Sequence, residues 1–508
     1  MAGLTPALVF TGFMGAGKSR ALRHAKAAGL YVADTDLLLA DELGSSIPDF
    51  FAAHGEEEFR RREGELVVRV LGEGHDAVAL GGGAVISPEV RGALGGHSVV
   101  WLRVPAAELW RRASGSARPL ARDKDEFLRL HAEREPLYRE LADAILLSAD
   151  EVPEALGALR ALAGSAADHL IWARADSGSY PVWIGSGVLA LAHDAAPGRP
   201  FGVTDTNVAP LYAADAGIAD AITVPAGEGA KTMNEAERVL AALADAGATR
   251  SDHVVALGGG VVGDLAGFCA SAYQRGIPVV QVPTSLLAQV DSAYGGKTGV
   301  DLGVAKNYVG AYHQPAAVVV DVATLGTLPV EELASGFVEV IKTALLAGGG
   351  MWERVRAVGA LDPPTLAPLV VDCAATKLEV VAADERDGSQ RAILNLGHTV
   401  GHGVEAAGAY EVYRHGEAVG LGLLAALRLS DAPGLRDEVA ELLGSHGLPV
   451  TLDDRIDTDD VMAAVGRDKK RTSADGLGFV LLPRPGEPEF GARVDPDRVR
   501  AAVEELRG

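Results

Sequence analysis

Short apolar runs alternate along the chain with longer Ala-rich segments in which apolar positions recur at helical spacing. We interpret four of the apolar runs as strands, at residues 7–10, 98–102, 253–257 and 278–282. Strands that alternate with helices are typical of α/β proteins whose sheet is mainly parallel. The pattern therefore predicts a layered α/β architecture along most of the chain.

The alternation changes character after about the first third of the chain. Residues 152–164 have the periodicity of a closing helix, and a small, polar stretch follows. Residues 171–185 then alternate as a β-hairpin does, with a turn at Asp176–Ser179. We place a domain boundary near residues 164–169.

Length and charge narrow the class of protein. The chain has 508 residues, too many for one ordinary core, so two or more domains are expected. Hydrophobic residues make up 48% and charged residues 23%, as in soluble globular proteins. The formal charge of −23 opposes binding to nucleic acid or to an anionic membrane. Neither a signal peptide nor an apolar run of spanning length is recognisable, so a cytoplasmic protein is expected.

Cysteine content limits the possible metal chemistry. Cys269 and Cys373 are the only cysteines, and they form no CxxC pattern. Neither a disulfide framework nor a thiolate zinc site is expected. A metal would therefore be bound by histidine and carboxylate.

The segment Gly12–Ser19, GFMGAGKS, fits the pattern G-x-x-x-x-G-K-[ST]. It follows the predicted strand at 7–10 and precedes a helical stretch, which is the context that the motif requires. Its glycines allow backbone amides to surround phosphates, Lys18 adds a positive charge, and Ser19 can bind Mg²⁺. The segment predicts a nucleotide site.

Two carboxylates, Asp34 and Asp36, stand two residues apart beyond this motif. At the end of a strand they would point to opposite sides, one toward a metal and one toward an acceptor hydroxyl. A solvated loop or a helix N-cap explains the same pair equally well. From the sequence, both interpretations stay open.

Six motifs in the first half, in the order GFMGAGKS, ADTD, FRRREGE, LGGGAV, ARPL and EREPLY, resemble shikimate kinase. The resemblance implies a parallel-sheet P-loop fold like that of nucleoside monophosphate kinases. It implies that ATP is bound by Gly12, Gly15, Ala16, Gly17, Lys18, Ser19 and Arg118. It implies Mg²⁺ at Ser19 and Asp34, shikimate at Asp36, Arg60, Gly82 and Arg134, and catalysis by Lys18, Asp36 and Arg118, with Arg118 on a lid. One departure is Arg20, where the family usually has Thr.

In the second half, the segment Leu394–Glu405 places His398 and His402 four residues apart, on one face of a helix. Two imidazoles on one face suggest a metal, and a buried structural pair explains them equally well. The zinc-protease pattern has Glu directly after the first histidine, whereas Thr399 stands here. Peptide hydrolysis is therefore not expected.

Further ligands for a metal are His415 and Glu339, since a catalytic site usually has three protein ligands. Glu339 also stands three residues before Lys342, as in a surface helix pair. Glycine turns at 226–232 and 258–268 suit a pyrophosphate, although the dinucleotide fingerprint is only loosely matched. Lysines in polar segments are candidates to bind phosphate or carboxylate: Lys297, Lys306 and Lys377.

Eight stretches of the second half resemble 3-dehydroquinate synthase: AGEGAKT, LGGGVVGDLAGF, YQRGIP, QVPTSLLAQVDSAYGGKTGVD, KNYVGAYHQP, SGFVEVIKTAL, LNLGHTVGHGVE and HGEAVG. The resemblance implies a Rossmann-like α/β domain followed by a mainly helical C-terminal domain, with the site between them. The expected division of the chain is a kinase-like domain at 1–165, a NAD-binding domain at 170–325 and a helical metal- and substrate-binding domain at 326–508.

The same resemblance implies the residues of the second site. Zn²⁺ or Co²⁺ would be bound by Glu339, His398 and His415, whereas His402 would serve the substrate. NAD would be bound by Asp205, Asn207, Glu228, Lys231, Gly259, Gly260, Asp264, Thr284, Ser285, Lys297 and Lys306. The heptulosonate phosphate would be bound by Arg275, Asp291, Lys297, Asn307, Lys377, Arg391, Asn395, His402 and Lys469, with Lys297 and His402 catalytic. Arg275 would reach across the interface of a homodimer. Asp387 stands where the family commonly has Glu, and its shorter arm is expected to need a water bridge.

The resemblances together imply a bifunctional enzyme of aromatic biosynthesis. One half would phosphorylate shikimate with ATP and Mg²⁺. The other would convert 3-deoxy-D-arabino-heptulosonate 7-phosphate to 3-dehydroquinate, with NAD⁺ reduced and regenerated in each cycle. Two alternatives remain, a related sugar-phosphate cyclase in the second half and a non-catalytic metabolite sensor in the first. Arg391 and Lys377 favour a substrate that carries a carboxylate.

Overall fold

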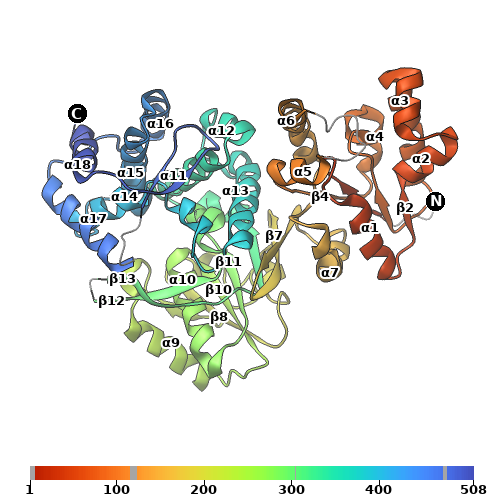
Figure 1. Ribbon diagram of the computed structural model, residues 1–508. Coiled ribbons are helices and arrows are strands. Elements are labelled where there is room, and N and C mark those ends of the chain that lie inside the picture. The colour runs from red at the N-terminus through yellow and green to blue at the C-terminus, as the bar shows by residue number, and fades with distance from the viewer. Residues whose placement is uncertain (1–5, 115–122, 304, 473–477, 508) are drawn as a thin grey trace. The chain divides into compact units, whose positions relative to one another are not determined.

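The computed structural model describes residues 6–114, 123–303, 305–472 and 478–507. The chain forms two compact units (Figure 1). The first contains residues 1–173 and 181–184, and the second contains residues 174–180 and 185–508. The expected α/β class is confirmed in both units. The finer division at residue 325 remains a prediction.

The sheet of the first unit has the strand order β2-β3-β1-β4-β5-β6-β7. Strands β1 to β6 run parallel to one another, and Val9 of β1 lies opposite Val78 and Val99. The strands are β1 (Leu8–Thr11), β2 (Val32–Asp34), β3 (Ala77–Ala79), β4 (Ser98–Leu102), β5 (Ala144–Leu146), β6 (His169–Ala175) and β7 (Gly178–Gly185). The strands predicted at 7–10 and 98–102 are thus β1 and β4.

Seven helices connect these strands: α1 (Lys18–Ala27), α2 (Thr35–Leu43), α3 (Ile47–Leu71), α4 (Pro88–Leu94), α5 (Ala106–Ala113), α6 (Lys124–Leu141) and α7 (Val152–Leu162). Ser46, Ser87 and Asp123 cap α3, α4 and α6 by accepting a backbone hydrogen bond. The core joins the apolar face of α3, including Leu66 and Val67, to the strands. Each such side chain contributes about 1.5–3 kcal/mol when it is fully buried.

The hairpin between β6 and β7 was predicted at 171–185, and the structure forms it from His169 to Gly185. Its turn is shorter than expected, because only Asp176 and Ser177 lie between the strands. Two-residue turns match the twist of antiparallel strands best.

The second unit contains a parallel sheet in the order β14-β11-β10-β8-β9. Its strands are β8 (Pro200–Asp205), β9 (Ile222–Val224), β10 (His253–Gly258), β11 (Val279–Pro283) and β14 (Ala317–Asp321). The connecting helices are α8 (Ala209–Tyr212), α9 (Met233–Asp245) and α10 (Gly260–Ala272). Leu243, Val254 and Leu265 are fully buried in the core between α9, α10 and the sheet. The strands predicted at 253–257 and 278–282 are β10 and β11.

The rest of the second unit is mainly helical, as expected, and its helices gather beyond the sheet (Figure 1). They are α11 (Val330–Ala347), α12 (Gly349–Arg356), α13 (Pro363–Ala383), α14 (His398–Ala407), α15 (His415–Leu429), α16 (Pro433–Ser445), α17 (Thr458–Thr472) and α18 (Pro496–Glu504). Two small antiparallel pairs complete the unit, β12 (Lys297–Leu302) with β13 (Ala305–Tyr312) and β15 (Phe479–Leu481) with β16 (Glu489–Ala492). A π-helical segment, Ala288–Ser292, follows β11.

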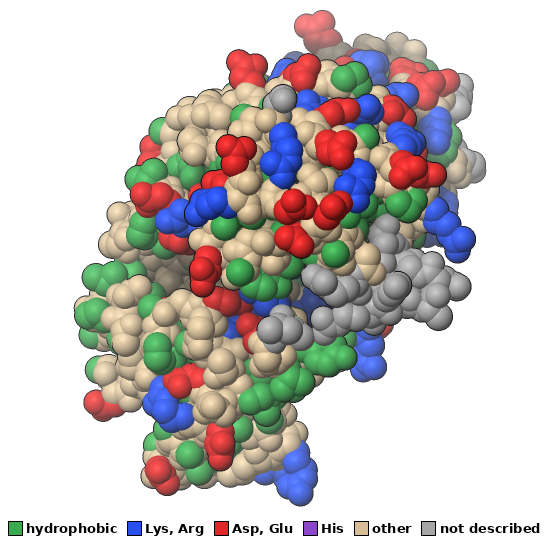
Figure 2. Space-filling model, turned by 90° about the vertical axis from the view of Figure 1, so that its left-hand side faces the viewer, with side chains coloured by type: hydrophobic (Ala, Val, Ile, Leu, Met, Phe, Trp, Pro, Cys, Tyr) green, Lys and Arg blue, Asp and Glu red, His purple; other side chains and the backbone are tan. Residues whose placement is uncertain are grey.

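Among the described residues, no helix combines the length and the apolar character that crossing a bilayer requires. On the face in Figure 2, Asp and Glu side chains are interspersed with Lys and Arg rather than gathered by sign.

Candidate functional sites

The loop between β1 and α1 forms an anion cradle in the first unit. Gly12, Gly15 and Gly17 have φ angles of 138°, 86° and 101°, which strongly favour glycine. The Nζ atom of Lys18 donates hydrogen bonds to the carbonyl oxygens of Gly12 at 2.9 Å and Phe13 at 3.2 Å. These bonds hold the ammonium group inside the loop, where backbone amides and a helix N-terminus favour phosphate.

Asp34 is the N-cap of α2, one of the interpretations that the sequence left open, and its second carboxylate oxygen lies against Ser19. Its Oδ1 accepts the backbone N–H of Asp36 at 3.1 Å and so caps α2, and its Oδ2 accepts the hydroxyl of Ser19 at 2.8 Å. A hydroxyl and a carboxylate oxygen this close fit two ligands of one Mg²⁺ ion. A pocket of about 360 Å³ is lined by Gly15, Gly17, Lys18, Ser19, Arg20, Arg23, Asp34, Asp36, Ala79, Leu80 and Arg112. Ala16 is buried beneath the loop.

On the acceptor side, Asp36 lies with a carboxylate that the sequence did not indicate, Glu63. A Cβ atom added to Gly81 would lie 2.5 Å from Glu63 Oε1 and 2.7 Å from Asp36 Oδ1, so both carboxylates converge on this glycine. Arg60 donates from NH1 to Glu63 Oε2 at 2.6 Å. Burial raises the pKa of Glu63, although Arg60 opposes the shift. The signal for Glu63 was its position three residues after Arg60 on α3.

Arg134 and Gly82 join this group from α6 and from the loop after β3. Arg134 is buried, and its Nε has no hydrogen-bond partner among the described residues. The hydroxyl of Tyr138 donates to the carbonyl of Gly82, which fixes the loop. A buried guanidinium with an unsatisfied N–H suits an anionic ligand. Arg118 lies outside the described residues.

The candidate metal ligands converge in the second unit. Glu339 comes from α11, whereas His398 and His415 are the first residues of α14 and α15. Glu339 Oε1 lies 3.5 Å from Nε2 of His398 and 3.6 Å from Nε2 of His415. Ligands of a tetrahedral Zn²⁺ stand roughly 3.4 Å apart. Glu339 is buried, and Lys342 pairs with its Oε2, so Oε1 is the oxygen left facing the two imidazoles. Oε1 has no hydrogen bond from the described residues, and the three side chains therefore fit a divalent cation.

The protonation of these groups also suits a cation. Burial lowers the pKa of His398 to about 3, with help from the positive charge of Lys342, so this imidazole is neutral. Burial opposes the charge on Glu339, but Lys342 and the histidines outweigh it and hold the pKa well below its usual range. Burial likewise opposes the charge on His415, but Glu339 and Glu405 raise its pKa to about 10. A cation would replace that proton.

Sequence reasoning placed Lys342 at the surface and missed its burial in the site. It forms an ion pair with Glu339, as the alternative interpretation had it, but on a buried face rather than at the surface. Glu339 and Lys342 are 0% and 1% exposed. Lys342 Nζ also lies 3.7 Å from Asp291 Oδ2. The ammonium group of Lys342 therefore belongs to the site.

His402 stands beside the metal group on α14, as the four-residue spacing predicted. Its ring centroid lies 5.3 Å from that of His398 and 5.9 Å from that of His415. It is exposed, unlike a structural core histidine. Ligand atoms of His402, Glu405 and His415 also lie within 4.8 Å of one another.

Two lysines bracket the carboxylate of Asp291, which lies on the π-helical segment. Lys377 from α13 donates to the Asp291 carbonyl at 2.5 Å and to its carboxylate, opposite Lys342. Burial lowers the pKa of Lys377, although Asp291 opposes the shift. These charges make an anionic substrate a better fit than a neutral one.

Arg391 and Asn395 lie in the segment just before α14, a few residues ahead of His398 in the sequence. Arg391 is 2% exposed, and its guanidinium donates to the carbonyls of Glu385 and Gly295, the latter at 3.1 Å. Arg391 therefore holds this loop together in the structure. Asp387 pairs directly with Lys297 at 2.6 Å, so the water bridge expected for its shorter arm is not needed for this contact.

Dinucleotide candidates gather at the carboxyl ends of the parallel strands. Asp205 ends β8 and accepts the backbone N–H of Asn207 at 2.8 Å. Gly259 follows β10, and Thr284 and Ser285 follow β11. This edge is where open α/β sheets bind nucleotides.

Close packing explains the paired glycines at the start of α10. A Cβ atom on Gly259 would lie 3.3 Å from Ser285 Oγ, and one on Gly260 would lie 3.0 Å from Ser292 Oγ. Bare backbone here lets the turn approach the neighbouring loop and a pyrophosphate, so the residues fit NAD.

A charge network continues from this edge. Lys231 Nζ lies 3.0 Å from Asp264 Oδ2 and 3.4 Å from Glu228 Oε1. Lys306 of β13 lies 3.8 Å from the same Glu228 oxygen and 3.5 Å from Oε1 of Glu405. The strand-edge group and the metal group are therefore linked through Lys306.

Two candidate substrate residues make no contact with the cluster among the described residues, and the side chain of a third is not described. Asn307 is exposed, and its N–H donates to Asp301 at 2.7 Å. Arg275 is exposed in the turn after α10 and makes no hydrogen bond or ion pair with the described residues. Lys469 belongs to α17, but its side chain lies outside the described part of the chain.

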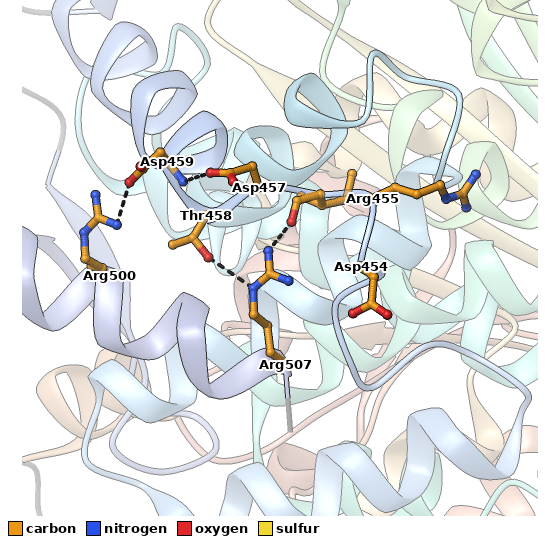
Figure 3. A pocket seen from close by; sticks show the side chains of 8 residues that line it. Asp454, Arg455, Asp457, Thr458, Asp459, Arg500 and Arg507 are labelled. Carbon is orange, nitrogen blue, oxygen red and sulfur yellow. Dashed lines mark hydrogen bonds and ion pairs between the residues drawn. The ribbon is translucent and has the colours of Figure 1, made fainter.

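A separate surface recess of about 480 Å³ lies between α17 and α18 (Figure 3). Arg500 pairs with Asp459 at 2.7 Å, and Arg507 donates to the Ile456 carbonyl and to Thr458. Its arginines are thus already satisfied by the protein, and none of the candidate residues lies there.

The family models match both halves. Residues 14–162 match the shikimate kinase model, residues 221–335 match 3-dehydroquinate synthase N-terminal, and residues 336–471 match 3-dehydroquinate synthase C-terminal. A 3-dehydroquinate synthase of Symbiobacterium thermophilum is 44% identical over 352 residues, which cover 65% of this chain and 98% of that protein. Fold and site thus define a chain with two enzyme modules, a kinase and a synthase.

The chain belongs to the 3-dehydroquinate synthase family, and it carries a shikimate kinase domain ahead of that module. Both resemblances noted in the sequence are confirmed. The structure is also similar to 2-deoxy-scyllo-inosose synthase complexed with carbaglucose-6-phosphate, NAD⁺ and Co²⁺, with 26% identity, a TM-score of 0.60, and 66% of this chain and 99% of that chain covered. A 2-epi-5-epi-valiolone synthase of Streptomyces hygroscopicus with NAD⁺ and Zn²⁺ bound is 28% identical, with a TM-score of 0.57 and 65% and 97% covered.

Proposed function

We propose that this chain catalyses two reactions of the shikimate pathway. The first module would transfer a phosphoryl group from ATP to shikimate. The second would convert 3-deoxy-D-arabino-heptulosonate 7-phosphate to 3-dehydroquinate and phosphate. The observation that carries the second activity is the convergence of Glu339, His398 and His415 beside the Asp291–Lys377 pair. The family matches at both halves support the pair of activities.

In the kinase module, the β1–α1 loop would bind ATP, and Lys18 would neutralise its phosphates. Ser19 and Asp34 would hold Mg²⁺. Asp36 would accept the proton of the shikimate hydroxyl, while Arg60, Gly82 and Arg134 hold the rest of the acceptor. Arg118 is proposed to stabilise the transferring phosphoryl group.

In the synthase module, bound NAD⁺ supplies a hydride acceptor, and the bound cation lowers the pKa of the hydroxyl groups it coordinates. Glu339, His398 and His415 would hold that cation, Zn²⁺ or Co²⁺. Lys377, Asn395 and Arg391 would orient the anionic substrate, and His402 would contact the leaving phosphate with Lys297. The protein's main contribution is to keep one substrate oriented through several steps.

Two assays on one preparation test the proposal. Phosphate release from the heptulosonate phosphate with NAD⁺ reports the synthase, and ADP release with shikimate reports the kinase. We expect both activities in the same chain. A preparation that loads metal and nucleotide but converts neither substrate would contradict the proposal, and ATP binding without ADP release would favour the metabolite sensor.

The structural similarity to 2-deoxy-scyllo-inosose synthase keeps a related cyclase as a second candidate. Arg391 and Lys377, the two buried basic residues already noted in the sequence, favour the carboxylated substrate instead. Comparing the heptulosonate phosphate with a hexose phosphate that lacks the carboxylate decides between them. Faster turnover of the hexose phosphate would favour the second candidate.

A homodimer in the cytoplasm is proposed as the working form. The exposed Arg275 would complete the phosphate site of the partner, and its exposure in the turn after α10 supports this role. Mixing inactive Arg275→Ala with inactive His398→Ala chains should restore part of the synthase activity if each site takes its arginine from the other chain. Lack of any restored activity in a mixed dimer would contradict this arrangement.

A further inference from the structure

Glu405 is a buried carboxylate beside the metal group that none of the proposed roles uses. It lies on α14, is 4% exposed, and its Oε2 stands 3.3 Å from Nδ1 of His415. The other ring nitrogen of His415, Nε2, stands 3.6 Å from Oε1 of Glu339. The two carboxylates therefore lie against different nitrogens of the same imidazole ring.

This arrangement determines which nitrogen of His415 is available. A carboxylate at Nδ1 accepts the N–H there, which leaves the lone pair of a neutral ring on Nε2. The bond also fixes the ring's rotation and increases its basicity as a ligand. The second oxygen of Glu405 lies 3.5 Å from Lys306, whose ammonium also stands 4.2 Å from the ring centroid of Tyr410.

Glu405 might instead be expected to bind a cation itself, because its ligand atoms cluster with those of His402 and His415. That arrangement would compete with the Glu339 group for His415. It would also leave Oε1 of Glu339 buried without a cation, since Lys342 pairs with the other oxygen, Oε2. A cation in the Glu339 group leaves no such deficit, because Glu405 is then satisfied by His415 and Lys306.

We propose that Glu405 is a positioning residue that orients His415 toward the cation and connects the metal group to the β12–β13 hairpin through Lys306. The inference rests on the proposed metal site. It adds a residue to that site that acts through a ligand rather than as one.

The test uses the full chain with Zn²⁺ and Co²⁺ as probes. Glu405→Gln keeps the shape of the side chain but removes its charge, and we expect zinc affinity, measured by competition with a chromophoric chelator, to fall about 10–100-fold. The Co²⁺ absorption spectrum should shift while one metal ion per chain is retained. Glu411→Gln, an exposed carboxylate after α14, is the matched control and should change neither quantity.

Other variants separate the possible outcomes. His398→Ala should lose metal binding altogether; if it does not, the proposed metal site itself is wrong. Unchanged affinity and an unchanged Co²⁺ spectrum in Glu405→Gln, with His398→Ala metal-free, would overturn the positioning role alone. Two metal ions per wild-type chain, one of them lost in Glu405→Gln, would make Glu405 a ligand and also overturn it.

If Glu405→Gln does not fold, Glu405→Asp takes its place as the test variant. It keeps the charge but shortens the reach, so we expect a smaller loss of affinity and a shifted spectrum. Lys306→Met should leave metal affinity within about threefold, because the carboxylate of Glu405 would still accept the N–H of His415. A loss as large as that of Glu405→Gln would place the orienting role on Lys306 and overturn the proposal.

Discussion

The two candidate sites differ in where their residues come from and in how deeply their charged groups are buried. The nucleotide site of the first unit comes largely from one loop, with Lys18 half-buried and Ser19 exposed. The metal site of the second unit draws on separate helices, and its charged groups Glu339, Lys342 and Lys377 are buried.

This difference has an energetic cause. In the first site, backbone carbonyls accept the hydrogen bonds of Lys18, and Ser19 is exposed to solvent. In the second site the charged groups are buried, and removing charges from water costs several kcal/mol for each ion. In the second site that cost is offset only by opposite charges at close range, such as Lys342 between Glu339 and Asp291. We infer that function and stability are separable in the first unit and coupled in the second.

The sharpest test of this comparison is reciprocal inactivation. Lys18→Ala should lower ADP release by about 10²–10³-fold, because it removes the charge that neutralises the phosphates. His398→Ala should lower phosphate release at least about 100-fold, because it removes a proposed metal ligand. Each variant should leave the other activity unchanged in parallel steady-state assays. If both activities fall together in a folded variant, the modules are not independent.

Metal removal should separate the units in the same way. Dialysis against a strong chelator, followed by excess Mg²⁺, should abolish phosphate release and leave ADP release intact, since a transition metal is proposed for the second site alone. Stoichiometric Zn²⁺ or Co²⁺ should restore phosphate release. Synthase activity that persists in a preparation shown to be metal-free would contradict the proposed centre.

Stability should respond differently to loss of a cation in the two units. Lys342→Met leaves the buried carboxylate of Glu339 without its lysine partner, whereas Asp291 keeps its pair with Lys377. We therefore expect the metal-free second unit to lose about 3–5 kcal/mol of unfolding free energy. The matched surface variant is Arg61→Met on α3, whose pairs with Glu58 and Glu65 are exposed, and it should not change stability measurably. Denaturant unfolding measures both; equal effects would remove the proposed distinction.

The smallest predicted effect concerns acid. Backbone N–H groups of Gly388, Ser389 and Arg391 hold the pKa of Asp384 at about 2, below the usual range of an aspartate. The contribution of Asp384 to stability is therefore complete above about pH 4 and is lost as the pH falls toward 2. Asp384→Asn should flatten the decline in unfolding free energy over this window. An unchanged slope would show that these bonds do not stabilise the loop that carries Arg391.

Local features were predictable from the sequence because their causes are local. The loop at Gly12–Ser19 forms as its glycines and flanks indicated, and His398 and His402 share α14 as their spacing required. The hairpin near residue 176 was also predictable, although its turn is shorter than expected.

The burial of Lys342 was not predictable in the same way. Helix α11 is buried without interruption from Leu333 to Leu346, so it has no polar face by which an exposed lysine could be told from a buried one. Glu63 was missed for a similar reason, since α3 carries many acid–arginine pairs at the surface. Only the neighbours packed around these helices show which charges are enclosed.

The sequence by itself determined the α/β pattern, the phosphate-binding loop and the spacing of the histidines, because these depend on backbone preferences and on residues close in the chain. The tertiary structure decided which charged side chains are buried together: Glu339, His398 and His415 around one point, with Lys342 and Glu405 behind them. Desolvation and Coulomb energy depend on distance in space rather than on distance along the chain.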